Sequence, residues 1–288
     1  MKTTVSEVAS LHAFVEQQER LHAFRAAHPR EQIVISGTTW SYILAGQGSE
    51  TILLLPGGER IGDLAFPIVQ QFEQEYRCLY PSYPPYSTMG ELVDGLAALL
   101  RKLSIEKVIL FAASFGGDVG QCFVRKYPDR VSKLILLNTG IPDKRLGKAT
   151  QRSKPFVTLL PMGIVRLLLQ KILVRVLSVR PEERLFWQEM LHELIAQLTR
   201  ADILSSFDET IDYRLNYQFT PDELASWMGK ILILQSEDDP ATKPAMRQAL
   251  RNLYPQARVH TFQNAGHTPF LSQPEEFYPL VNSFLHES

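Results

Sequence analysis

A serine at position 114 lies where a predicted strand turns sharply into a predicted helix. Residues 107–120 read KVILFAASFGGDVG, an apolar run that stops at two alanines before the serine and continues as a helical pattern. A strained turn of this kind lifts a serine hydroxyl above the sheet edge. The positions two before and two after must be small because the strand and helix backbones nearly touch, and here they are Ala112 and Gly116. The pattern A-x-S-x-G predicts a nucleophilic serine.

A nucleophilic serine needs a base, and the base needs an orienting acid. The apolar run at 231–234 leads directly into an acidic stretch that contains Asp238 and Asp239, and His267 follows a later predicted strand at 258–262. Groups placed after the carboxyl ends of parallel strands meet at the edge of the sheet where ligands bind. We therefore expect Ser114, His267 and an aspartate to converge.

Three acids are candidates for the orienting role. Asp238 and Asp239 are both open, since the side chain of Asp239 could orient the base or could instead cap the following helix and leave the role to Asp238. Asp143, which follows the strand ending at 137, is a more distant alternative. No histidine stands at ligand spacing from Glu237 or Asp238, so we predict no metal, and nothing in the sequence indicates a cofactor.

Strand patterns alternate with helix patterns along most of the chain. This alternation predicts an α/β fold with a mostly parallel central sheet flanked by helices. An amphipathic helix at 6–27, with Leu11, Phe14, Val15, Leu21 and Phe24 as its apolar positions, and two antiparallel strands come first. The predicted strands cover 32–35, 39–44, 51–55, 77–80, 108–111, 133–137, 230–235 and 258–262, and the later helices 63–76, 91–103, 243–254 and 275–285.

The alternation breaks between residues 141 and 229, where only helical patterns occur. We therefore predict one core domain, residues 1–140 and 230–288, with an N-terminal helical extension over 1–28, interrupted by a helical cap over 141–229. The cap holds an apolar run at 156–165 and an amphipathic helix in which Arg166, Lys171 and Arg175 interrupt the leucines. A basic amphipathic helix can lie on a membrane, but we expect this apolar stripe to pack against its own protein. Apolar and aromatic cap side chains would then roof the site and favour apolar acyl or aryl groups.

Composition and charge exclude several classes of protein. The formal net charge of −1 provides no overall field to attract nucleic acid or anionic membranes. The two cysteines, Cys78 and Cys122, are too few for a disulfide framework and indicate a reducing compartment. No secretory leader and no apolar run of about 20 residues is apparent. We expect a cytoplasmic monomer or homodimer without integral membrane association.

Four stretches, LLLPGG, AASFGGD, LILQSEDDP and NAGHTPFLSQPEEF, resemble the α/β-hydrolase superfamily from about Thr39 to the C-terminus. The resemblance implies that fold with an inserted cap, and a triad of Ser114, Asp239 and His267. It also implies an oxyanion hole from the backbone N–H groups of Phe115 and Gly58, although Pro56 replaces the histidine usual in that loop. LLLPGGERIGD, LYPSYPPYSTMGELVDGL and ILFAASFGGDVGQCF are most similar to maspardin-like members, over about the first half of the chain.

These residues together predict a serine hydrolase that cleaves a carboxylic ester or related acyl compound with an apolar group through an acyl-enzyme. The alternatives are a non-catalytic binding or scaffold protein of the maspardin-like kind, and a carbon–carbon bond hydrolase, lactonase or acyltransferase on the same triad. The expected partner is a small-molecule substrate.

Overall fold

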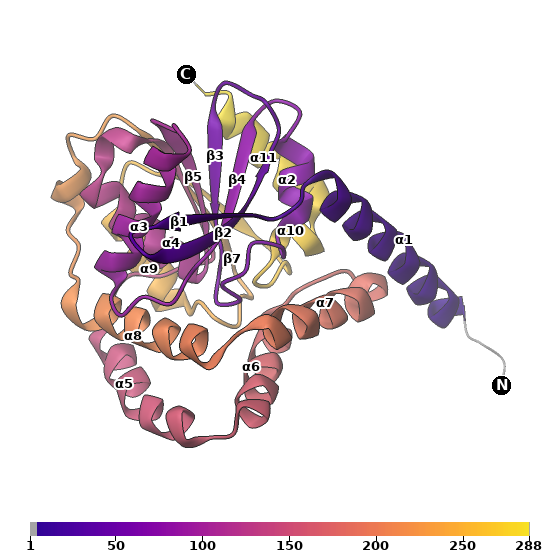
Figure 1. Ribbon diagram of the computed structural model, residues 1–288. Coiled ribbons are helices and arrows are strands. Elements are labelled where there is room, and N and C mark those ends of the chain that lie inside the picture. Colours follow the sequence, from indigo (N-terminus) through magenta and orange to yellow (C-terminus); the bar gives the residue numbers. More distant parts are fainter. Residues whose placement is uncertain (1–4, 288) are drawn as a thin grey trace.

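The fold is built on one eight-stranded sheet whose strands lie in the order β1-β2-β4-β3-β5-β6-β7-β8. The computed structural model describes residues 5–287, so the expected N-terminal extension is described from Val5 onward. β1 and β2 are antiparallel, and all pairings from β4 to β8 are parallel. Helices cover both faces of the sheet (Figure 1). The predicted α/β fold with an antiparallel opening pair is confirmed.

The strand bounds are β1 Glu31–Ile35, β2 Thr38–Ala45, β3 Thr51–Leu55, β4 Arg77–Ser82, β5 Val108–Ala113, β6 Val131–Leu137, β7 Lys230–Ser236 and β8 Arg258–Phe262. The α-helices are α1 Val5–Ala27, α2 Phe66–Phe72, α3 Met89–Lys102, α4 Phe115–Lys126, α5 Lys144–Leu159, α6 Met162–Val176, α7 Arg184–Gln197, α8 Arg200–Asn216, α9 Pro244–Leu253, α10 Pro269–Ser272 and α11 Pro274–Leu285. Three 3₁₀ turns cover Pro128–Arg130, Pro181–Glu183 and Pro221–Leu224.

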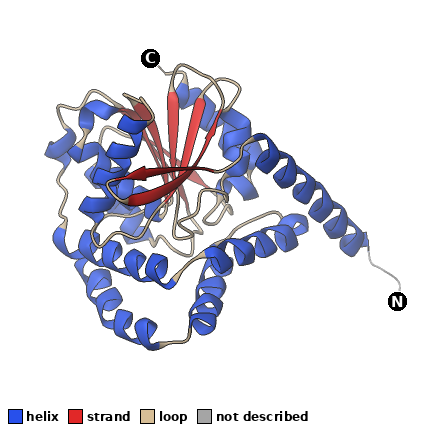
Figure 2. Cartoon of the chain, viewed as in Figure 1, coloured by secondary structure: helices blue, strands red, loops and turns tan. Residues whose placement is uncertain are grey.

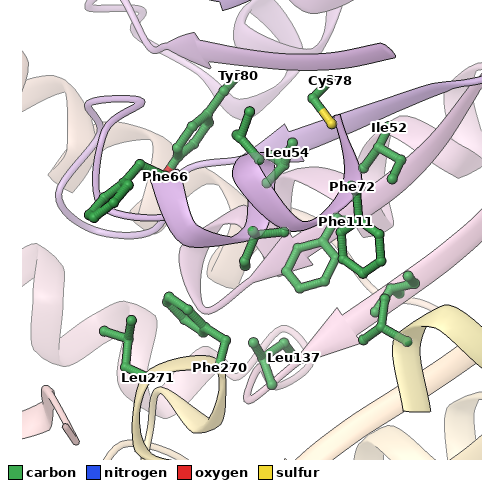
Figure 3. Packing of buried hydrophobic residues seen from close by; sticks show 14 of the residues in the cluster. Ile52, Leu54, Phe66, Phe72, Cys78, Tyr80, Phe111, Leu137, Phe270 and Leu271 are labelled. Atoms are coloured by element: carbon green, nitrogen blue, oxygen red, sulfur yellow. The ribbon is translucent and has the colours of Figure 1, made fainter. Parts of the chain in front are cut away.

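The sheet separates two hydrophobic cores. Successive side chains of a strand point to opposite faces, so Ile52 and Leu54 of β3 belong to one core and Leu53 and Leu55 to the other. Figure 3 shows the first core, where Ile52, Leu54 and Phe111 lie close to Phe72 of α2. The second core is closed by α3, α4 and α9. Because both faces of the central strands are buried, these strands are continuous apolar runs.

Two helices differ from the sequence prediction. The helix expected over 63–76 is restricted to Phe66–Phe72, because Pro67 is tolerated only in a first turn and Asp63 is held in the preceding loop by Arg25 and Arg30. In α1, Leu11 and Val15, two of the apolar positions of this amphipathic helix, are 63% and 49% exposed. The C-terminal part of α1 packs against α2, α7 and the turn at Pro181–Glu183, while its N-terminal part projects beyond the body of the protein (Figure 1).

Helices α5 to α8 lie between β6 and β7 in sequence and below the sheet in Figure 2. Residues 141–229 are called the cap segment from here on. Within it α5 packs on α8 and α6 packs on α7. The expectation that the apolar stripe of α6 packs against the protein is wrong for Leu167, Leu168 and Ile172, which are exposed. None of the described helices is both long enough and apolar enough to cross a membrane.

A buried ion pair ties the cap segment to the loop after β3. Nη1 of Arg60 lies 2.5 Å from Oε2 of Glu209 on α8, and Nη2 donates to Oε1 at 3.2 Å. Nη2 also donates to the carbonyl of Pro84 at 3.1 Å, and the guanidinium lies over the ring of Tyr83. Both charged side chains are almost completely buried. Removing one partner would therefore leave a charge without water or a counter-ion.

We predict that Glu209→Leu lowers the free energy of unfolding by about 3–5 kcal/mol, because it leaves Arg60 buried and unpaired. The double variant Arg60→Met/Glu209→Leu should recover most of that loss, since apolar residues of similar size can replace a buried pair. Urea unfolding of the single and double variants checks this. A double variant that is no more stable than Glu209→Leu would contradict it.

Candidate active site

The turn that carries Ser114 is strained and closely packed. Ser114 has φ 52° and ψ −121° and lies between β5 and α4. A Cβ on Gly116 would lie 2.3 Å from the carbonyl oxygen of Leu55, so only glycine lets α4 approach β3 this closely. A Cβ on Gly120 would lie 2.9 Å from the Cβ of Ala112, which shows how little space surrounds the alanine of the A-x-S-x-G pattern. The strand-turn-helix arrangement expected around Ser114 is therefore present.

Asp239 and His267 are hydrogen-bonded to one another. The Oδ1 atom of Asp239, just after β7, lies 2.8 Å from Nδ1 of His267, on the loop after β8. Asp239 also accepts hydrogen bonds from the Ala241 N–H and the Thr242 hydroxyl. Burial alone would raise the pKa of Asp239, but the hydrogen bond and charge of His267, with those two donors, hold it below its ordinary value. The carboxylate is thus kept ionised beside the imidazole.

The other two candidate acids have different partners. Asp238 accepts hydrogen bonds from the N–H groups of Ala265 and Gly266 at 3.1 and 3.0 Å and so holds the loop that leads to His267. Asp143 caps α5 by accepting from the N–H groups of Arg145 and Leu146. Of the three acids left open by the sequence, Asp239 is the one bonded to the histidine ring.

Ser114, Phe115, Gly58 and His267 all line one cavity of about 250 Å³. Its walls are mainly aliphatic. The cap segment contributes Ile172, Leu173, Val176, Leu177 and Leu191. The aromatic roof expected from the sequence is wrong, because Phe186 and Trp187 pack against Phe66 in the core below α1 instead. The site is therefore a small apolar cavity with a few polar groups.

Glu59 is a cavity residue that the sequence analysis did not identify. Its side chain is buried in the cavity wall, and its Oε1 accepts a hydrogen bond from the Gly57 N–H at 2.9 Å. Burial raises the pKa of Glu59, although its backbone hydrogen bonds and the charge of His267 act in the opposite direction. Since the Gly57 amide is engaged, Gly58 is the neighbouring glycine of this loop left to act as the expected oxyanion donor.

Asn138, directly after β6, binds the loop between β8 and α10 that contains His267. This loop, residues 263–268, is called the histidine loop from here on. Its Nδ2 donates to the carbonyls of Gly266 and His267 at 3.0 and 2.9 Å, and its Oδ1 accepts from the Ser236 N–H at 2.7 Å. Asn138 is buried and has φ 43°, a left-handed conformation that asparagine tolerates better than most residues. One side chain therefore joins the ends of β6 and β7 to the histidine loop.

Ser178, in the cap segment just after α6, also binds the histidine loop. Its hydroxyl accepts a hydrogen bond from the His267 N–H at 3.1 Å. Its own N–H donates to the Thr268 hydroxyl oxygen at 2.9 Å, and its carbonyl accepts from that hydroxyl at 2.6 Å. The histidine loop is thus attached to both the sheet and the cap segment.

The raised pKa of Glu59 predicts a pH-dependent effect of Glu59→Gln. The folded protein retains this proton above the ordinary Glu pKa of about 4.3, whereas the unfolded chain releases it. Wild-type stability therefore falls as pH rises from about 4 toward the raised pKa, and glutamine removes this loss.

Relative to wild type, Glu59→Gln should be more stabilising at about pH 8 than at about pH 4, measured as the difference in Tm. The matched control is Glu106→Gln at an exposed site. An equal Tm difference at both pH values would contradict the prediction.

Comparison with known proteins agrees with this fold. Residues 50–274 match the family described as the alpha/beta hydrolase fold. Maspardin of Danio rerio is 26% identical over 276 residues, which cover 92% of this chain and 85% of maspardin. The resemblance to maspardin, expected for about the first half of the chain, is thus confirmed and extends over most of its length. The sn-1-specific diacylglycerol lipase of Mus musculus is 23% identical over 70% of this chain and 67% of its own length.

Solved structures share the fold. A hydrolase from Pseudomonas aeruginosa superposes with a TM-score of 0.77 at 19% identity, covering 90% of this chain and 99% of its own. The enol-lactonase from Burkholderia xenovorans superposes with a TM-score of 0.74 at 18% identity, covering 89% of this chain and 100% of its own. Since the family match extends over more than half of the sequence, the chain belongs to the α/β-hydrolase fold family, and maspardin-like proteins are among its relatives.

Proposed function

We propose that this protein is a cofactor-independent serine hydrolase that cleaves a carboxylic ester or related acyl compound with a small or medium apolar group. The observation that carries the proposal is the Asp239–His267 hydrogen bond of 2.8 Å beside a cavity that Ser114, on its strained turn, also lines. Relatives named as a lipase and as a lactonase support hydrolysis in general. The ester substrate is inferred from the site.

In the proposed mechanism, His267 removes the proton of the Ser114 hydroxyl as the serine oxygen attacks the substrate carbonyl. Asp239 holds the imidazole in the required tautomer and stabilises its protonated form. The N–H groups of Phe115 and Gly58 bind the developing oxyanion. The tetrahedral intermediate then expels the alcohol, which takes the proton from His267, and the acyl group stays on Ser114. A water molecule, activated by His267, releases it as the acid.

The cavity supports an apolar substrate of limited size. Its volume of about 250 Å³ lies just below the usual range for drug-sized ligands, and its lining is dominated by aliphatic side chains. Among the described residues, this lining contains no Lys or Arg, so an anionic group on the substrate would have no counter-ion there. A short acyl chain or a small ring suits these dimensions.

Ser114→Ala should lower kcat on a chromogenic ester at least ~10³-fold, because it removes the nucleophile and leaves binding intact. The measurement is turnover of p-nitrophenyl esters graded by acyl length, together with labelling by a fluorophosphonate probe. Wild type should be labelled and should prefer the shorter esters, and Ser114→Ala should not be labelled. Wild-type protein that is folded but neither labelled nor active would instead support the scaffold alternative.

Substitution of the neighbouring aspartates distinguishes their roles. Asp239→Asn should lower kcat about 10⁴-fold, because the amide no longer favours the required imidazole tautomer. Asp238→Asn should cost at most about tenfold, because asparagine can still accept from the Ala265 and Gly266 N–H groups. The reverse order of the two effects, measured with the same ester, would assign the orienting role to Asp238.

A further inference from the structure

Helices α5 and α6 and the turn between them, residues 144–176, form a projecting unit that we call the α5–α6 hairpin. In Figure 1 its turn is the part of the cap segment farthest from the sheet. Around this turn Phe156 is 72% exposed and Leu159 is 84% exposed. Ile164, Leu167, Leu168 and Ile172 are also exposed and follow the i, i+3, i+4 spacing of a single side of α6. The hairpin therefore carries a group of apolar side chains that the described part of the protein leaves exposed.

The same segment carries a concentrated positive charge. Residues 144–180 contain nine Lys or Arg and no Asp or Glu, in a chain whose net charge is −1. Two of the nine are paired with acids elsewhere: Lys154 with Asp208, and Arg180 with Glu275. Arg152, Lys171 and Arg175 take part in no ion pair among residues 5–287 and lie on the exposed side of their helices.

Near the turn the exposed side chains are mainly apolar, whereas Arg152 on α5 and Lys171 and Arg175 on α6 lie nearer the body, with Ile172 beside Lys171. Arg166 lies at the apolar level, but its Nη2 donates to the Leu198 carbonyl. At 1.5 Å per residue, Arg152, Lys171 and Arg175 lie about 10, 14 and 20 Å along their helices from the turn. An amphipathic helix buries its apolar side about 5–10 Å into a membrane interface. Arg152 and Lys171 would then lie at the level of the lipid headgroups, and the long side chain of Arg175 would reach toward them.

The charge of the hairpin distinguishes two possible partners for its exposed apolar side chains, a second copy of the chain and a lipid bilayer. A second copy joined through the same surface would bring two basic segments together, and residues 144–180 contain no acid to pair with them. An anionic lipid surface supplies both the apolar layer and the opposite charge. A fluid bilayer also accepts a projecting turn without a matching groove.

We propose that the α5–α6 hairpin binds the surface of an anionic lipid bilayer, with Phe156, Leu159, Leu167 and Leu168 inserted among the acyl chains and Arg152, Lys171 and Arg175 on the headgroups. The inner side of α6 contributes Leu173 and Val176 to the wall of the cavity that Ser114 lines. Binding would therefore hold that cavity next to the bilayer. The hairpin lies on the membrane and does not span it.

The test is co-flotation of the full chain with phosphatidylcholine vesicles that contain or lack phosphatidylglycerol. Wild type should bind the anionic vesicles at least ~10-fold more tightly, with binding weakened by high salt. Leu167→Ser/Leu168→Ser should weaken this binding at least ~10-fold. Arg152→Gln/Lys171→Gln/Arg175→Gln should remove the preference for anionic vesicles.

The matched controls change exposed residues elsewhere. They are Leu11→Ser/Val15→Ser on α1, and Arg101→Gln/Lys102→Gln/Lys107→Gln near the end of α3. Both should bind like wild type, and all variants should keep the wild-type Tm. Ser114→Ala should also bind like wild type, so this readout does not depend on hydrolysis.

Three results would overturn the proposal. The first is no wild-type binding to the anionic vesicles. The second is equal loss of binding in the hairpin variants and their controls. The third is a change of oligomeric state without vesicle binding. If light scattering shows that wild type is a dimer and Leu167→Ser/Leu168→Ser a monomer, and neither protein binds vesicles, the surface belongs to a second copy.

Discussion

The close contact between the start of α4 and the end of β3 is the constraint on which the site depends. Gly116 approaches the Leu55 carbonyl so closely that a side chain would not fit, and the turn that brings it there gives Ser114 a positive φ of 52°. The strain is supported by hydrogen bonds on both sides of the residue, from the Ser114 N–H to Leu137 and from the Thr139 hydroxyl to the Ser114 carbonyl. The position of Ser114 therefore depends on backbone packing and on hydrogen bonds to its own backbone, and not on the other side chains of the site.

The fold could be predicted because the apolar runs, the helices between them and the strand pairing that they require all indicate the same architecture. Continuous apolar runs at 51–55 and 231–234 indicate strands buried on both faces, and the helices between them require parallel pairing. Parallel strands end at a common edge, so residues just after β5, β7 and β8 must lie near one another. This argument is sufficient to bring Asp239 to His267, and the choice between Asp238 and Asp239 needed only the geometry of their short loop.

The residues that the sequence could not predict act through contacts between distant segments. Glu59, Asn138 and Ser178 have no local pattern that distinguishes them from ordinary loop residues, and each acquires its role from the groups the fold places beside it. The burial of the apolar side of α6 in the cap segment was predicted wrongly for a related reason. Helical periodicity identifies an apolar side of α6, but it does not state whether the protein covers that side, so the exposure of Leu167 and Leu168 required the structure.

The hydrogen bonds of Ser178 have a consequence for any exchange of the cap segment. Because one cap residue bonds to the backbone of His267 and to Thr268, the cap segment and the histidine loop form a single mechanical unit. A chimera that receives the helices of another family member must also receive a hydroxyl at this junction, or the imidazole loses a support more than 80 residues away in sequence. Because Ser178 directly follows Leu177 of the cavity wall, a change in the lining that moves this junction would also move His267.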